Sequence, residues 1–222
     1  MTEIVKHKIQ LILGGARSGK SSLAEQYAML SKLPVTYIAT AQALDAEMAQ
    51  RIAQHQAERP THWRLIEAPL QLSVTIESII SEALSSNSSG VCILVDCLTL
   101  WLSNSLCQSN SSTDSNINVS QDSCNSEYWQ QEKQQFLKLL NSLQDVNFAR
   151  EKTQTFAIEL ILVSNEVGHG IVPMGELSRQ FVDQAGWLHQ AIAKVADKVE
   201  FVMAGLPLTL KSVENISHKA PL

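Results

Sequence analysis

Gly14-Gly15-Ala16-Arg17-Ser18-Gly19-Lys20-Ser21 matches the pattern G-x-x-x-x-G-K-[ST]. The stretch stands between an apolar run, Ile9 to Leu13, and a helix-favouring segment that begins at Ser22. In this setting, backbone N–H groups and the N-terminal end of the following helix face the phosphates of a nucleotide. The lysine is placed to reach the terminal phosphates, and the last serine to bind magnesium. The stretch therefore predicts a phosphate-binding loop (P-loop) for a nucleoside triphosphate.

Apolar and helix-favouring segments alternate along the rest of the chain. This alternation predicts an α/β fold, a P-loop NTPase-like domain with a mostly parallel central sheet flanked by helices. In such sheets ligands bind at the carboxyl ends of the strands. The expected strands are 9–13, 34–39, 91–96, 160–164 and 198–204, and the expected helices are 45–59, 130–143 and 178–196.

Length and composition favour one domain over residues 1–222. The 222 residues are 45% hydrophobic, which is enough to bury a substantial core. The formal net charge is −5 and no window is rich in Lys and Arg, so we expect no nucleic-acid partner. The longest apolar run, Val91 to Leu102, is interrupted by Asp96 and is too short to span a bilayer. With no signal-peptide layout at the N-terminus, a cytoplasmic location is expected.

Three other parts of the chain carry weaker signals. Residues 103–126 are rich in Ser and Asn and are expected to form a mobile surface insertion, with a binding lid as the alternative. Residues from about 213 to 222 are expected to form a flexible tail. The cysteines form no C-x-x-C pair, so free thiols are expected rather than a metal site: Cys92, Cys97, Cys107 and Cys124.

Two residues outside the P-loop suggest chemistry. Asp96 ends an apolar strand, where a carboxylate beside a P-loop typically holds magnesium together with Ser21; a loop or helix-capping aspartate is the alternative. His55 lies four residues after Arg51 in an amphipathic segment that ends at Pro60. A neutral imidazole can attack phosphorus, but a lone histidine near a helix end is more often a surface residue. The pattern by itself leaves both interpretations of His55 open.

Several motifs in order resemble one enzyme family. They are the P-loop at 14–21, Tyr37 to Ala41, the segment 45–60 with His55, Glu67-Ala68-Pro69, Leu94 to Asn104, and Ser164 to Pro173. Together they resemble the bifunctional adenosylcobinamide kinase/adenosylcobinamide-phosphate guanylyltransferase. The resemblance covers nearly the whole chain outside the Ser/Asn-rich stretch.

The resemblance implies a late step of cobalamin biosynthesis. The family phosphorylates the hydroxyl of the aminopropanol arm of adenosylcobinamide with a nucleoside triphosphate, and then transfers GMP from GTP to that phosphate. Adenosylcobinamide-GDP and pyrophosphate are the products. The family's GMP-histidine intermediate falls on His55, and Lys20 is the second catalytic residue that it implies. GTP, ATP and Mg²⁺ are the implied cofactors, the corrinoids are the implied small-molecule partners, and the family's trimers imply a homotrimer.

The nucleotide contacts implied by the family lie in four short segments. Glu67 is a plausible reader of guanine N1–H and the 2-amino group, with pairing to Arg64 as the alternative. Arg59 is a plausible phosphate ligand, with a solvated helix end as the alternative. The full set is Gly14, Gly15, Ala16, Arg17, Ser18, Gly19, Lys20, Ser21, Ala39, Thr40, Ala41, Gln56, Ala57, Glu58, Arg59, Glu67 and Asp96.

A few residues in the second half of the chain also suggest particular positions or contacts. Asn165-Glu166 follows a strand and suits polar contacts over a ligand, whereas His169 is expected to be an exposed turn residue. His189 stands where the family commonly has Asn, which would alter a polar contact near the corrinoid or at a subunit interface. Two other functions remain as alternatives: a P-loop kinase without a covalent intermediate, and a nucleotide-dependent switch protein.

Overall fold

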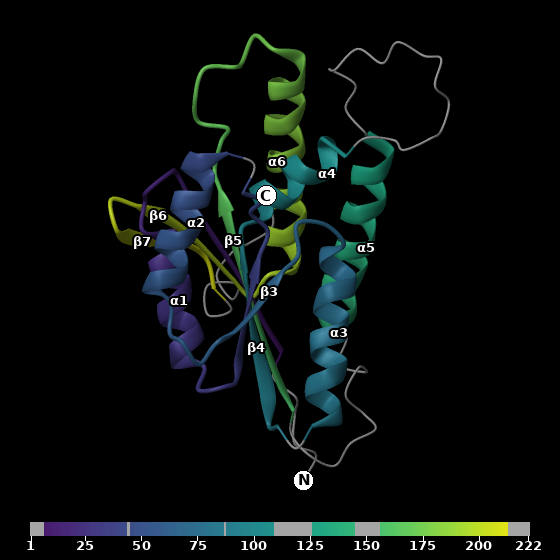
Figure 1. Cartoon of the computed structure of the whole chain (residues 1–222). Coiled ribbons are helices and arrows are strands. Elements are labelled where there is room, and N and C mark those ends of the chain that lie inside the picture. The colour runs from purple at the N-terminus through teal and green to yellow at the C-terminus, as the bar shows by residue number, and fades with distance from the viewer. Residues whose placement is uncertain (1–6, 44, 87, 109–125, 145–155, 213–222) are drawn as a thin grey trace.

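A computed structural model describes residues 7–43, 45–86, 88–108, 126–144 and 156–212. Strands and helices alternate along these residues, as Figure 1 shows. The elements are β1 (His7–Gly14), α1 (Lys20–Leu30), β2 (Val35–Ala39), α2 (Ala46–Glu58), β3 (Arg64–Glu67), α3 (Leu72–Ser85), β4 (Gly90–Asp96), α4 (Leu98–Leu106), α5 (Ser126–Gln144), β5 (Ala157–Asn165), α6 (Glu176–Val195), β6 (Lys198–Met203) and β7 (Leu206–Lys211).

The strands form one sheet in the order β3-β2-β4-β5-β1-β6-β7. Neighbouring strands are parallel except for β6 and β7, which form an antiparallel hairpin at one edge. The prediction of a mostly parallel sheet flanked by helices is therefore confirmed. Because β5 lies between β4 and β1, its carboxyl end separates the end of β4 from the P-loop that follows β1.

Helices cover both faces of the sheet (Figure 1). Along β4, Val91, Ile93 and Val95 belong to the hydrophobic cluster under α3 to α6, while Cys92 and Leu94 belong to the cluster under α1. Successive side chains of a strand point to opposite faces, so a strand covered on both sides is apolar throughout. This is why the uninterrupted apolar run before Asp96 forms a central strand.

The layer made by α4, α5 and α6 packs around fully buried aromatic rings. The Trp101 ring lies 5.0 Å from that of Trp129 and 5.1 Å from that of Phe136, both in edge-to-face arrangements. Each indole N–H has a buried acceptor: Trp101 Nε1 donates to Glu132 Oε2 at 2.9 Å and Trp129 Nε1 donates to Gln184 Oε1 at 2.7 Å. These contacts join the three helices through both apolar area and satisfied polar groups.

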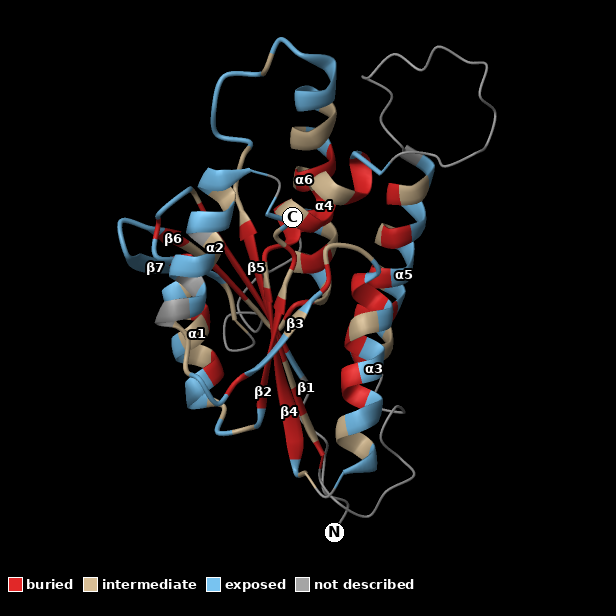
Figure 2. Cartoon of the chain, viewed as in Figure 1, coloured by how far each residue is buried: buried red, intermediate tan, exposed pale blue. Residues whose placement is uncertain are grey.

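Helix α2 is packed far less tightly. The Asp45 carboxylate accepts a hydrogen bond from the Met48 N–H at 2.7 Å, which caps the N-terminus of the helix. None of its described side chains is buried, and only Met48 and Ile52 are half-buried. Figure 2 shows this difference as the exposed colouring of α2 against the buried stripes of α3 and α5.

Four elements were not among those expected: β3, α3, α4 and β7. The expected insertion also begins too early, because α4 continues to Leu106 and buries Ser105 and Leu106. Most of that stretch, residues 109–125, lies outside the described residues, as does the expected tail at 213–222. Among the described residues, the structure has no helix long and apolar enough to cross a membrane.

Candidate nucleotide-binding site

A cleft of about 740 Å³ opens at the carboxyl ends of β2, β4 and β5. It lies between the P-loop and α2, where ligands bind in open α/β sheets. Its lining residues are Ala16, Arg17, Ser18, Gly19, Lys20, Ser21, Ser22, Tyr37, Ala39, Ala41, Gln42, Ala43, Met48, Ile52, Arg59, Glu67, Pro69, Asp96, Cys97, Leu100 and Asn165.

The backbone of the P-loop has the conformation that its glycines predict. Gly19, the N-cap of α1, has φ 95°, and a Cβ there would lie 3.2 Å from the Cα of Gly205. A Cβ on Gly14 would lie only 2.6 Å from the carbonyl oxygen of Val202. The Gly205 N–H also donates to the Ser18 carbonyl at 2.9 Å. The hairpin of β6 and β7 therefore packs against the loop and supports its shape.

Two side chains of the loop are prepared for an anion. Lys20 is only 8% exposed, lines the cleft, and donates from Nζ to the Gly15 carbonyl at 3.2 Å. The buried Ser18 hydroxyl has no hydrogen-bond partner in the structure. A buried hydroxyl without a partner is costly, and a phosphate oxygen would satisfy it. Lys20 and Ser18 thus fit the predicted phosphate site.

Asp96 and Ser21 both line the cleft, as their predicted roles require. A carboxylate and a hydroxyl are the oxygen ligands that Mg²⁺ prefers, and Mg²⁺ usually takes its remaining ligands from water and substrate phosphates. Within the described part of the chain there is no group of three or more His, Cys, Asp or Glu residues that could hold a metal ion. The Asp96 carboxylate and the Ser21 hydroxyl therefore fit a magnesium ion that also binds the triphosphate.

Arg59 lies over the Tyr37 ring, with Cζ 3.9 Å from the ring centre. Burial raises the pKa of Tyr37, and the Asp96 carboxylate raises it further, although Arg59 opposes the shift. The phenol therefore stays neutral beside Asp96. The alternative of a solvated helix end for Arg59 does not hold, because the side chain is half-buried and stacked at the cleft.

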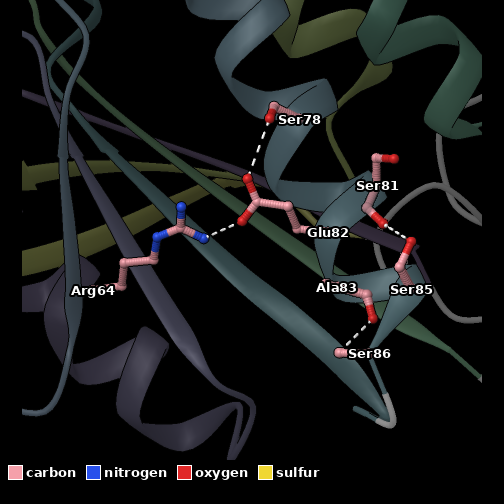
Figure 3. Close-up of polar contacts among 7 residues, drawn as sticks. All are labelled: Arg64, Ser78, Ser81, Glu82, Ala83, Ser85 and Ser86. Carbon is pink, nitrogen blue, oxygen red and sulfur yellow. Dashed lines mark hydrogen bonds and ion pairs between the residues drawn. The ribbon is translucent and has the colours of Figure 1, made fainter.

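Glu67 lines the cleft at the end of β3, where the guanine-reading interpretation requires it. The alternative partner of Glu67, Arg64, makes its ion pair with Glu82 of α3 at 2.5 Å instead. Figure 3 shows Arg64 of β3 joined to Glu82 of α3, with Ser78 also donating to Glu82. Arg64 therefore pairs with α3, whereas Glu67 lines the cleft.

Thr40 differs from its predicted role as a nucleotide contact. It is fully buried, its hydroxyl donates to the Cys97 carbonyl at 2.7 Å, and it accepts from the Cys97 N–H at 2.8 Å. The Asn104 amide N–H₂ group donates to the carbonyls of Thr40 and Pro69 at 2.8 and 3.1 Å. The side chain of Thr40 therefore holds the loop after β2 against the loop after β4, and does not line the cleft.

Asn165 is a lining residue whose role the sequence did not assign. It ends β5, between the P-loop and Asp96, and both its backbone N–H and its side-chain Nδ2 donate to Thr99 Oγ1, at 3.4 and 3.1 Å. Thr99 Oγ1 also lies 3.1 Å from Cys97 Sγ. The signal in the sequence was a polar residue directly after an apolar strand, the same signal that identified Asp96.

The predicted contacts on α2 are only partly placed. Met48, Ile52 and Arg59 line the cleft, whereas Gln56 is exposed and lies outside it. The side chains of Arg51, His55, Ala57 and Glu58 are outside the described residues. By helical spacing, position 55 shares a face with positions 48 and 52.

A buried polar cluster lies behind Asn165. His189 is 5% exposed, its Nε2 lies 2.7 Å from Ser164 Oγ, and its Nδ1 lies 3.5 Å from Glu166 Oε2. Glu166 Oε1 accepts from the Gly168 N–H at 2.7 Å. Burial lowers the pKa of His189, and the nearby Glu166 charge opposes this shift. His169, by contrast, is exposed in the turn, as predicted.

The described cysteines are free, as predicted. Cys92 and Cys97 are buried, and burial raises the pKa of the Cys92 thiol to about 12 and that of the Cys97 thiol to about 11. Such thiols are unreactive at neutral pH. Cys107 is exposed, and Cys124 lies outside the described residues.

Comparison with known proteins identifies the chain's family. Residues 10–210 match the family described as cobinamide kinase / cobinamide phosphate guanyltransferase. The bifunctional adenosylcobalamin biosynthesis protein CobP of Pseudomonas aeruginosa is 49% identical over 202 residues, which are 90% of this chain and 96% of that protein. The bifunctional adenosylcobalamin biosynthesis proteins CobU of Salmonella typhimurium and Escherichia coli are each 35% identical over 90% of this chain and 98% of theirs.

Among solved structures, a protein from Pyrococcus horikoshii OT3 matches with a TM-score of 0.50 and 11% identity, over 97% of this chain and 90% of that one. At this identity the likeness concerns the fold alone. The sequence relatives and the family match extend over the P-loop, β4, α2 and β5, which together form the cleft. The chain therefore belongs to the cobinamide kinase / cobinamide phosphate guanyltransferase family, and it is a bifunctional kinase and guanylyltransferase.

Proposed function

We propose that one nucleotide cleft carries out two successive transfers. In the first, the aminopropanol hydroxyl of adenosylcobinamide attacks the γ-phosphorus of ATP or GTP, and a nucleoside diphosphate leaves. In the second, GMP passes from GTP to the new phosphate by way of His55. The products are adenosylcobinamide-GDP and pyrophosphate.

The observation that carries this proposal is the position of α2 across the cleft from the P-loop. Met48 and Ile52 of α2, and Arg59 directly after it, border the same cleft as Lys20 and Asp96, and helical spacing predicts position 55 on the face of Met48 and Ile52. A nucleophile on α2 can therefore approach a nucleotide whose phosphates lie on the loop. A conventional kinase would need no nucleophile there.

The guanylyl transfer takes place in two displacements at the α-phosphorus of GTP. An imidazole nitrogen of His55 forms a bond to the α-phosphorus, the bond from that phosphorus to the bridging oxygen breaks, and pyrophosphate leaves. A phosphate oxygen of adenosylcobinamide phosphate then attacks the same phosphorus, the nitrogen–phosphorus bond breaks, and His55 is regenerated. Lys20 and the loop N–H groups stabilise the charge of the pyrophosphate.

Three further parts of the proposal rest on the site chemistry and the family. Ser21 and Asp96 would hold a magnesium ion, which would neutralise part of the triphosphate charge. Glu67 would select guanine through its N1–H and 2-amino group.

We also propose a homotrimer, to be measured by light scattering. Exposed leucines of the edge strand β7 offer apolar surface for subunit contact: Leu206, Leu208 and Leu210.

The test of the covalent step is labelling with GTP that carries ³²P at the α-position, in the presence of Mg²⁺ and without corrinoid. We expect protein-bound label that is lost in acid and survives alkali, as a phosphoramidate does. His55→Ala should abolish the label. His62→Ala is the matched control, because His62 is exposed in the turn after α2 and should leave the label unchanged.

Nucleotide binding by the unlabelled protein must be measured in parallel. Label on His55→Ala would place the intermediate on another residue. Nucleotide binding without label on the wild type would contradict the intermediate and leave a kinase with no covalent step.

A further inference from the structure

We propose that a groove between α4 and α6 holds one edge of the corrinoid macrocycle during both transfers. This inference rests on the proposed function, because it assigns the place of the acceptor substrate. The groove has a volume of about 370 Å³ and is separate from the nucleotide cleft. It is lined by Ser103, Leu106, Cys107, Pro173, Leu177, Ser178, Phe181 and Val182.

The groove lies next to the nucleotide cleft. Leu100 of α4 lines the cleft, and Ser103, one helical turn later, lines the groove. The chain between β5 and α6 also borders both cavities, because Asn165 at the end of β5 lines the cleft and Pro173 lines the groove. A substrate seated in the groove would therefore lie beside the nucleotide cleft, and a flexible arm could extend from the groove into the cleft.

The chemistry of the lining matches a corrinoid and not a second nucleotide. None of the groove's lining side chains is charged, so nothing there would neutralise a phosphate. A corrin ring instead presents methyl groups and uncharged amide arms at its rim. Apolar contacts with Phe181 and Leu177, and hydrogen bonds from the Ser103 and Ser178 hydroxyls, suit such a rim.

The surface beside the groove extends the apolar area. Ile171, Val172 and Met174, in the connection between β5 and α6, are 97%, 73% and 96% exposed. Arg179 Nη1 donates to the carbonyls of Pro173 and Met174, which ties this connection to the start of α6. Because a whole macrocycle exceeds the volume of the groove, one edge would enter it and the ring face would lie against this exposed apolar surface.

The first test fills the groove. Ser178→Trp places a large ring in it and should raise the KM for adenosylcobinamide by about tenfold or more, with the KM for GTP unchanged. Ser81→Trp is the matched control: Ser81 is an exposed serine near the end of α3 (Figure 3) that lines neither cavity, and it should change neither constant. Phe181→Ala, which removes the largest lining side chain, should raise the same corrinoid KM.

Labelling of the protein by α-labelled GTP, which needs no corrinoid, separates the two proposals. Wild type without label would overturn the proposed covalent function. Normal label on Ser178→Trp with an unchanged corrinoid KM would overturn the groove assignment. A change of oligomeric state in Ser178→Trp, without a corrinoid effect in Phe181→Ala, would also overturn it and make the groove a subunit contact.

The second test uses Cys107 as a reporter. It lines the groove and is exposed, whereas the other two described thiols are buried and have raised pKa values. In a Cys124→Ser background, a maleimide should react with Cys107, and adenosylcobinamide should slow that reaction several-fold at saturation. GTP alone should not slow it. Equal rates with and without the corrinoid would contradict the proposal.

Discussion

The two faces of the sheet differ in what they contribute. On one face, α3, α4, α5 and α6 bury a continuous cluster that includes the aromatic rings of Trp101 and Trp129. On the other face, the cluster under α1 is smaller, and α2 adds no buried side chain among its described residues. The nucleotide cleft lies between the P-loop and this loosely packed helix.

Stability and chemistry therefore depend on different helical layers of the same domain. A dense layer fixes the sheet, and the sheet holds the P-loop, Asp96 and Asn165 at the ends of adjoining strands. The second layer can then remain weakly packed around a ligand. Substitutions in the first layer should therefore lower the free energy of unfolding, and substitutions in the second should lower turnover.

The largest expected effect is on stability, in the dense layer. Trp129→Ala removes a buried ring and its hydrogen bond to Gln184, and should lower the free energy of unfolding by about 3–5 kcal/mol. Urea denaturation followed by circular dichroism measures it. Trp187→Ala is the control, because Trp187 is 56% exposed on α6 and its loss should cost far less. Equal losses would show that the dense layer does not carry the stability.

The next largest effect is on chemistry, at the P-loop that faces the loosely packed helix α2 across the cleft. Lys20→Ala removes the ammonium group that lines the proposed phosphate site and should lower turnover by about 10²–10³-fold, close to 2.7–4 kcal/mol in the barrier. Its free energy of unfolding should change little. Steady-state kinetics and urea denaturation on the same sample check both statements. A large loss of stability with modest loss of turnover would contradict the division between layers.

Trp101→Phe should have a smaller effect on stability. It keeps most of the ring but leaves the buried Glu132 carboxylate without its indole donor, which should cost about 1–3 kcal/mol. Thermal unfolding measures it. The double variant Trp101→Phe/Glu132→Met should recover part of the loss, because it also removes the orphaned carboxylate. A double variant no more stable than the single one would show that lost packing is the cause.

His189 should make a pH-dependent contribution. Burial holds its pKa below the ordinary value of 6.5, so the unfolded chain binds a proton at a higher pH than the folded one. The contribution of neutral His189 is complete above pH 6.5 and is lost as the pH falls toward the lowered pKa. His189→Asn should flatten the dependence of the unfolding free energy on pH as the pH falls below 6.5. An unchanged slope would show that other titrating groups cause the pH dependence of the unfolding free energy.

The smallest effect belongs to the ion pair of Arg64 and Glu82. Both side chains are 52% exposed, so Arg64→Ala should lower the Tm only slightly, and less still at high salt. Thermal unfolding at two ionic strengths measures it. A drop in Tm as large as that of Trp101→Phe would show that β3 depends on this pair for its position on the sheet.

Most of the fold could be predicted where strands are covered on both faces. The runs before Gly14, Asp96 and Asn165 are apolar because they are central, and each appears in the structure. Strand β3 escaped prediction because three of its four residues are exposed at the sheet edge, and β7 because all but one of its residues are exposed. Helix α3 could have been found, since Leu72, Ile76, Ile79 and Ile80 repeat at helical spacing and are buried.

The candidate site was predictable where a motif fixes the backbone. The residues 16–21, Glu67 and Asp96 line the cleft as expected. Thr40 does not, because its hydroxyl bonds with the backbone of Cys97, a partner that becomes a neighbour only through the pairing of β2 with β4. For the same reason, no local pattern could link Asn165 to Thr99, or His189 to Ser164 and Glu166.

The central place of β1 also has a consequence for biosynthesis on the ribosome. Its two neighbours are β5 and β6, and the Gly205 N–H supports the P-loop from the turn after β6. Pairing of this kind joins segments far apart in the chain and slows folding. The P-loop is therefore translated well before its supports and lacks them until β5, β6 and the turn at Gly205 have emerged. A nascent chain arrested before β6 should fail to retain GTP, and one released after β7 should retain it.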